Sequence, residues 1–73
     1  MIIFIERLKQ LRHSHGITQE QLAKAIGASG RGIQHYELGT RKPSGEMLIA
    51  LADYFDVSLD YLTGRSDKAE VNR

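Results

Sequence analysis

Seventy-three residues form one small domain and leave no room for a second. The chain has no cysteine, which excludes disulfides and thiolate metal sites and fits a reducing compartment. The net charge of +1 indicates no partner by itself, but seven basic and three acidic residues lie up to Lys42, whereas three basic and six acidic residues follow from Pro43 onward. A polyanion would therefore meet the first part of the chain.

The chain starts with a short apolar run that stops at Glu6. A run this short falls far below the roughly 20 apolar residues that a transmembrane helix needs. No basic segment precedes it, as one would in a secretory signal. We therefore expect a soluble, cytoplasmic protein.

Helical signals recur along the chain, and no segment shows the sustained alternation typical of strands. A first helix is predicted to end at Gly16, with three apolar residues on one face: Phe4, Leu8 and Leu11. Thr18 and Gln21 have the spacing of a capping box at the start of a second helix. Gly27 suits the left-handed residue that ends this helix. Its buried stripe is predicted to comprise Leu22, Ala23 and Ile26.

Three further helices are predicted, each with a serine at its N-cap. The third is capped by Ser29 and ends at Gly39, with Ile33 and Tyr36 facing inward. A loop of residues 40–43 follows, because proline disfavours helix at the residue before it. The fourth and fifth helices are capped by Ser44 and Ser58, and their buried residues are predicted to be Leu48, Leu51, Ala52, Phe55, Leu59 and Leu62. The fold class is therefore all-α, a compact five-helix bundle.

The bundle is predicted to span residues 1–64, because Gly64 closes the fifth helix. The remaining residues, 65–73, are mostly polar. We expect them to form a frayed tail.

The most informative segment runs from Gln19 to Leu38. It predicts a helix of about eight residues, a short turn at Gly27 and a second helix. Ala23 is small enough for the two helices to cross closely, Gly27 can adopt positive φ, and Ile33 supplies the apolar residue that locks the pair. Alanine, glycine four residues later and an apolar residue six later are the signature of a helix-turn-helix.

With these residues in place, the chain resembles the Cro/phage-repressor-like helix-turn-helix domains, also called the XRE family. The resemblance covers residues 4–64 and includes many positions in one order. The segments that carry it are residues 6–12, 16–23, 33–37, 39, 41–44 and 57–62. It implies a λ-repressor-like bundle that binds double-stranded DNA and regulates transcription.

The resemblance also implies which residues contact DNA. The second helix of the motif, residues 29–37, would be the recognition helix in the major groove. Base edges would be read at the positions of Gly30, Arg31, Gln34 and His35. Phosphates would be contacted by Gln19, Ser29, Arg41 and Lys42.

The sequence departs from the family pattern at Gly30 and Gly32, where polar side chains are usual. Each glycine costs roughly 1 kcal/mol relative to alanine in a helix interior. We hypothesise that these glycines permit close backbone approach to DNA, or leave the start of the helix unformed until DNA binds. Arg31 would then be the principal base reader, bidentate to a guanine.

Other chemistry has little support in the sequence. His13 and His15 are two residues apart on a helix, so they point to different sides, and no third ligand completes a metal site. No serine, histidine and acid are arranged for nucleophilic catalysis. We expect no enzyme activity, no metal and no cofactor, and no small-molecule substrate is evident.

The predicted function is that of a repressor that binds a pseudo-palindromic operator as a homodimer. Four residues are candidates for excess apolar surface at the dimer interface: Ile2, Ile3, Tyr54 and Tyr61. Repression is expected because a chain without a sensor domain can do little beyond occupying DNA. Two alternatives stay open: a protein-interaction module such as a toxin-neutralising antitoxin, and a helical fragment of an enzyme.

Overall fold

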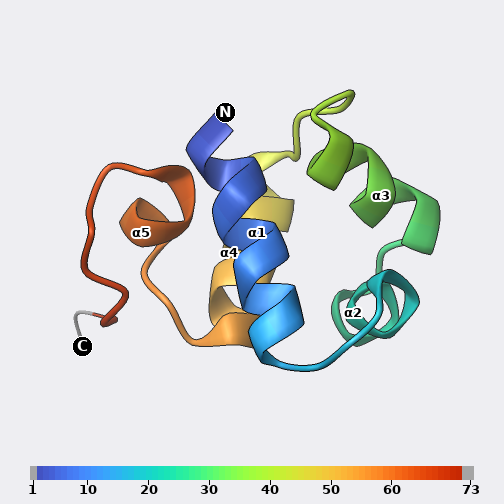
Figure 1. Cartoon of the computed structure of the whole chain (residues 1–73), viewed down its shortest axis with the longest axis horizontal. Coiled ribbons are helices and arrows are strands. Elements are labelled where there is room, and N and C mark those ends of the chain that lie inside the picture. Colours follow the sequence, from blue (N-terminus) through green and yellow to red (C-terminus); the bar gives the residue numbers. More distant parts are fainter. Residues whose placement is uncertain (1, 72–73) are drawn as a thin grey trace.

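The structure is a computed structural model that describes residues 2–71, apart from the side chain of Ile2. These residues form five helices joined by short connections (Figure 1). The helices are α1 (Ile2–Ser14), α2 (Gln19–Ile26), α3 (Gly30–Leu38), α4 (Gly45–Phe55) and α5 (Leu59–Thr63). The predicted all-α, five-helix class is therefore confirmed.

The helices surround one small core (Figure 1). In this view α1 crosses the middle in front of α4, with α2 and α3 on one side and α5 on the other. The helix pair α2 and α3 packs together, α1 contacts α3 and α5, and α4 contacts α2 and α5. Because α3 packs on α1 and α2 packs on α4, the helix pair is anchored to both central helices. Within residues 2–71, no helix is long and apolar enough to cross a membrane.

The buried apolar residues come from all five helices and from the connection between α4 and α5. They are Phe4, Leu8, Leu22, Ala23, Ile33, Tyr36, Leu51, Ala52, Phe55, Val57 and Leu62. Leu11, Ile26 and Leu48, which the sequence placed on the apolar faces of their helices, are only partly buried and pack against this core. Burial of apolar surface is the main stabilising term in so small a domain, and the helical periodicity of the sequence predicted nearly all of this set.

The helix ends agree with the predicted caps. Thr18 Oγ1 accepts from Gln21 N at 3.0 Å, and Gln21 Oε1 accepts from Thr18 N at 2.8 Å, which completes the capping box. Ser29, Ser44 and Ser58 cap α3, α4 and α5 in the same manner. These caps satisfy backbone N–H groups that the first turn of a helix leaves unpaired.

Gly27 lies in the turn between α2 and α3 with φ of 72°, the left-handed region that favours glycine. A Cβ at this position would meet no atom within 4 Å, so its cost is purely conformational. We expect Gly27→Ala to lower the free energy of unfolding by about 1–2 kcal/mol, measured by urea denaturation. Gly45→Ala is the matched control, since it also meets nothing within 4 Å but has no positive φ. It should stabilise the domain by about 0.4–1 kcal/mol; equal effects of the two changes would contradict the argument.

Two predicted side-chain environments are wrong. Leu59 was expected beside Leu62 in the core, but it is 41% exposed. It is the first residue of a five-residue helix, and helical side chains lean toward the N-terminus, so this one extends past the core. Tyr61 was expected to be exposed, but it is half-buried, and the Arg7 guanidinium carbon lies 4.0 Å from its ring centroid.

The segment after α5 lies against the bundle as far as the structure describes it. Ser58 N donates to Ala69 O at 2.9 Å, and Ala69 packs against the core. The Arg7 guanidinium donates to the carbonyls of Tyr61 and Ser66 and pairs with Asp67 at 3.1 Å. The division of the chain at Gly64 stays a prediction.

Candidate DNA interface

The helix pair α2 and α3 has the geometry of a helix-turn-helix. Three residues, 27–29, separate the helices, and Ala28 N donates to Ala23 O at 2.8 Å across the turn. Ala23 is 2% exposed and Ile33 is fully buried, as the motif requires. A small residue in the first helix lets the second approach closely, which fixes the direction in which α3 projects.

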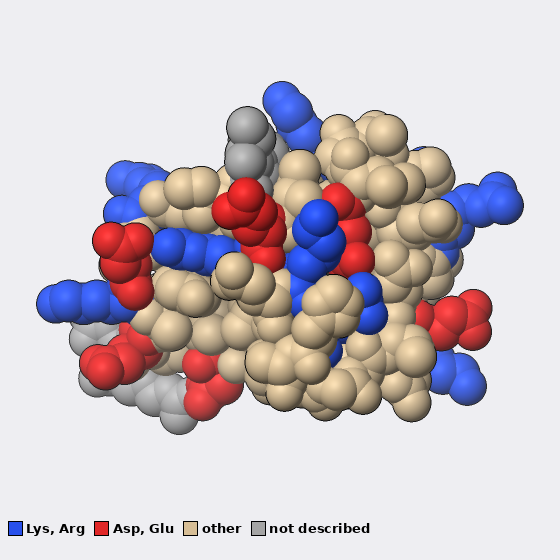
Figure 2. All heavy atoms as spheres, viewed as in Figure 1, with Lys and Arg blue, Asp and Glu red and all other residues tan. Residues whose placement is uncertain are grey.

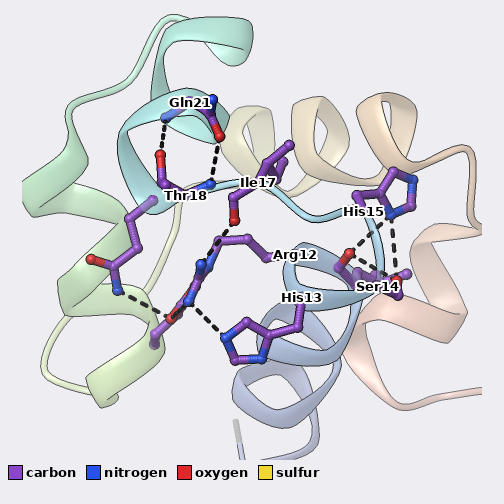
Figure 3. A network of polar contacts seen from close by, with 10 residues as sticks. Arg12, His13, Ser14, His15, Ile17, Thr18 and Gln21 are labelled. Atoms are coloured by element: carbon purple, nitrogen blue, oxygen red, sulfur yellow. Dashed lines mark hydrogen bonds and ion pairs between the residues drawn. The ribbon is translucent and has the colours of Figure 1, made fainter.

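A buried ion pair ties this motif to α1. Arg12 binds the Glu37 carboxylate through two hydrogen bonds, Nε to Oε2 at 2.6 Å and Nη2 to Oε1 at 3.1 Å. Arg12 Nη1 also donates to Ile17 O at 3.0 Å, a contact drawn in Figure 3. Glu37 is 7% exposed, and no buried side-chain nitrogen or oxygen among the described residues lacks a hydrogen-bond partner. The pair therefore joins α1, the turn after it and α3.

The sequence did not indicate this pair, because the two residues are 25 positions apart in the chain. The signal that could have found it is the helical register. Glu37 follows directly after the inward-facing Tyr36, and Arg12 follows Leu11, which packs against the core. A charged residue next to a core position is a candidate for burial with an opposite charge.

Gln19, a predicted phosphate contact, is the first residue of α2. Its side-chain Nε2 donates to Glu37 Oε1 at 3.1 Å, so the carboxylate that holds Arg12 also orients this amide. An amide nitrogen carries two hydrogens, and the second is free to donate to another acceptor. The role of Gln19 toward phosphate stays a prediction.

Two of the predicted base readers, Arg31 and Gln34, lie on the outward side of α3. Both are exposed. Neither side chain has a hydrogen bond or ion pair with any residue in the range 2–71. They lie within the first five residues of α3, the part of a recognition helix that faces base edges.

His35 is half-buried and is tied to the loop after α3. Its Nδ1 lies 2.8 Å from Thr40 Oγ1, and its carbonyl accepts from Thr40 N at 3.0 Å. The ring therefore has only Nε2 left for an external partner. Base reading by His35 stays a prediction.

Both glycines of α3 lie within the helix, which is formed from Gly30 onward without DNA. The hypothesis that its start is unformed until DNA binds is therefore not supported. A Cβ on Gly32 would lie 3.1 Å from Ser29 Oγ, the atom that accepts from Gly32 N at 3.0 Å. The absence of a side chain at Gly32 thus leaves room for the Ser29 hydroxyl that caps α3. Gly30 faces α2, where a Cβ would lie 3.0 Å from Glu20 Cγ.

The remaining predicted phosphate contacts lie at the two ends of α3. Ser29 precedes it; its hydroxyl accepts from Gly32 N and can still donate. Arg41 and Lys42 are exposed in the connection between α3 and α4. The structure therefore brings Gln19, Ser29 and the recognition positions onto the α2–α3 unit, with Arg41 and Lys42 in the loop that follows.

Charge is distributed unevenly over the molecule. In Figure 2 basic side chains project at the margin beside α2 and α3, and basic and acidic groups are intermixed at the centre and on the side of α5. Lys24, Arg31, Arg41 and Lys42 are exposed on or next to the α2–α3 unit. Such a distribution favours approach of a polyanion from this side.

The histidines near the end of α1 have local partners. His13 Nε2 lies 3.2 Å from Arg12 Nη2, and His15 Nδ1 lies 2.9 Å from Leu11 O (Figure 3). The His15 ring also packs edge-on against Phe55, with centroids 4.9 Å apart. Residues 2–71 contain no cluster of three or more histidine or acidic side chains that could hold a metal ion.

Comparison with known proteins places this chain in a family. The helix-turn-helix family matches residues 8–62. YobD of Bacillus subtilis (strain 168), an uncharacterized HTH-type transcriptional regulator, is 42% identical over 65 residues, 89% of this chain and 58% of YobD. The chain therefore belongs to the helix-turn-helix family, in its Cro/phage-repressor-like (XRE) branch of DNA-binding transcriptional regulators. This is a family of regulators and not of enzymes, as the sequence predicted.

Solved structures of the P22 c2 repressor are similar in fold. Its complex with a synthetic operator has a TM-score of 0.78 at 35% identity, covering 82% of this chain and 91% of that chain. The solution structure of its DNA-binding domain has a TM-score of 0.80 at 33% identity, covering 96% and 91%. The chain spans about half the length of the curated relatives it matches, with 58%, 52% and 53% of the first three covered.

Proposed function

We propose that this chain is a sequence-specific repressor that binds a pseudo-palindromic operator in double-stranded DNA as a homodimer. The observation that carries the proposal is the outward side of α3, where Arg31 and Gln34 are exposed and make no polar contact within the described residues. The buried α2–α3 contact and the Arg12–Glu37 pair hold this side in a fixed direction. A rigid element with free polar side chains is suited to reading base edges.

The other residues of the interface have positioning roles in this proposal. Gln19, Ser29, Arg41 and Lys42 would bind phosphates on either side of the groove, which orients α3 without reading sequence. The similarity to the P22 c2 repressor bound to its operator supports both the DNA ligand and the repressor role. Repression would follow from occupation of a promoter.

The homodimer is proposed on geometric grounds. A two-fold dimer places two recognition helices about 34 Å apart, so that both enter the major groove on one face of the duplex. Ile3, Tyr54 and Leu59 are exposed apolar residues on α1, α4 and α5 and are the candidates for its interface. Ile2, also a candidate in the sequence, lies outside the described side chains, and the ring of Tyr61 is already covered by Arg7.

The test is selection of binding sites from a pool of genomic fragments by the purified chain at moderate salt, beside Arg31→Ala. Wild type should enrich a two-fold site. Because Arg31 is proposed to bind a guanine with two hydrogen bonds, its removal should relax one base position per half-site by about 1–3 kcal/mol. Arg65→Ala is the matched control, since Arg65 is an exposed arginine after α5, and it should enrich the wild-type site unchanged.

Two outcomes would contradict the proposal. If wild type enriches no site and its weak binding is lost with salt equally for all sequences, binding is non-specific, and the protein-interaction reading is favoured. If a site is enriched but Arg31→Ala selects the same bases at every position, the DNA role stands and the assignment of Arg31 is wrong.

A further inference from the structure

The recognition helix lacks a side chain at its first position, Gly30. In a helix-turn-helix this part of the second helix contacts base edges. Gly30 is half-buried and in regular helical conformation, so positive φ does not explain the glycine. The space that a side chain would enter is already occupied.

The occupant is the side chain of Glu20, which reaches across from α2. A Cβ built on Gly30 would lie 3.0 Å from Glu20 Cγ and 3.3 Å from its Oε1. The carboxylate therefore lies beside the start of α3, where the side chain of residue 30 would begin. Glu20 is exposed, and its carboxylate has no hydrogen bond or ion pair with any other residue in the range 2–71.

An unpaired carboxylate on this surface is unexpected for a protein that binds a polyanion. Lys24, Arg31, Arg41 and Lys42 are exposed on or next to the same unit, and an acidic group among them weakens attraction to phosphates. Helix stabilisation explains an acid in the first turn of α2. It does not explain why the side chain lies against Gly30.

We propose that Glu20 is a specificity-determining residue that replaces the missing side chain at position 30 and reads a cytosine. This inference rests on the proposed DNA-binding function and adds a residue from α2 to the recognition surface. Carboxylate oxygens accept hydrogen bonds and cannot donate. In the major groove cytosine presents the N4 amino donor without an acceptor, whereas adenine adds the N7 acceptor and guanine presents two acceptors.

The experiment compares site selection by wild type, Glu20→Gln and Glu20→Ala, followed by affinity measurements on operators that differ only at the assigned position. Wild type should prefer cytosine there by roughly 5- to 150-fold, the range for one well-made base contact. Glu20→Gln should shift the preference toward adenine, since an amide can donate to N7 and accept from N6. Glu20→Ala should have no preference at that position.

Asp60→Asn is the matched control. Asp60 is the second residue of α5, as Glu20 is of α2, so each change removes one acidic charge from an exposed first turn. Asp60→Asn should leave the selected site unchanged. Circular dichroism and thermal unfolding of each variant separate a change of specificity from loss of fold.

Gly30→Ala tests the same contact from the other side. Its Cβ would require the Glu20 side chain to shift by a few tenths of an ångström, and alanine is the better helix former, so α3 itself should not be weakened. Gly30→Ala should reduce the cytosine preference in wild type and have no effect at that position in the Glu20→Ala background, the non-additivity expected of residues in contact.

The results distinguish this inference from the proposed function. If wild type selects an operator and Glu20→Ala selects identical bases at every position, the inference is overturned and the function stands. If wild type selects no operator, the proposed function fails and the inference fails with it.

Discussion

Glu37→Ala is expected to lower the free energy of unfolding by about 3–5 kcal/mol, because it leaves a buried arginine without its counter-charge. The Arg12 side chain is only 13% exposed, and its remaining partners are Ile17 O and the His13 ring. Removing one partner of a buried pair costs far more than the pair contributes, since the other charge stays desolvated. Urea denaturation followed by circular dichroism measures the loss, which is a large fraction of the stability of a domain this small.

Glu6→Ala is the control for removing a glutamate from the domain. Glu6 is exposed on α1, and the change should alter stability by no more than about 0.5 kcal/mol. The double variant Arg12→Met, Glu37→Leu should recover most of the loss, because it removes both charges together. A loss below about 1 kcal/mol for Glu37→Ala would show that Arg12 finds water or another partner.

Ile33→Ala should be the most damaging truncation of an aliphatic side chain on α3, with a loss of about 2–5 kcal/mol in the free energy of unfolding. Ile33 is fully buried on the inward side of α3, so the change removes apolar contact and leaves a cavity between α3 and the rest of the core. Ile33→Val should cost about 0.5–1.5 kcal/mol by the same reasoning. Thermal and urea unfolding measure both variants.

Leu38→Ala is the matched control on the same helix. Leu38 is 64% exposed, and its truncation should change stability by no more than about 0.5 kcal/mol. Below its unfolding temperature, Ile33→Ala should still select the wild-type site, because the residue faces away from the groove. Equal losses for Ile33→Ala and Leu38→Ala would mean that burial does not determine the stability of α3.

The sequence predicted most of the fold because its signals are local. Thr18 and Gln21 are three residues apart, and the capping box they form depends on no other element. The positive-φ glycines at helix ends and the periodic core residues are likewise read within one turn of helix. For the same reason the boundaries of α2 and α3, and the exposure of Arg31 and Gln34, agree with prediction.

The contacts that escaped prediction join different elements of the fold. The pairing of Arg12 with Glu37, the position of Glu20 beside Gly30 and the packing of Arg7 on Tyr61 depend on how helices cross. Periodicity identifies the face that a helix buries, but it does not determine which residue on that face meets which partner. Leu59 shows a second limit of periodicity. Its helix is only about one turn long, which is too short for the buried face to be inferred from the spacing of apolar residues.

The side chains on the outward side of α3 have a consequence for how the DNA specificity of this domain can change in evolution. Arg31 and Gln34 make no polar contact with the described residues, so under the proposed function their exchange would alter the DNA sequence recognised at little cost in stability. Gln19 is different, because its amide shares a carboxylate with the buried arginine. Duplicated copies of such a gene could therefore acquire new DNA target sequences through one or two substitutions on α3. The proposed phosphate contacts, which orient the domain on the duplex, would stay the same.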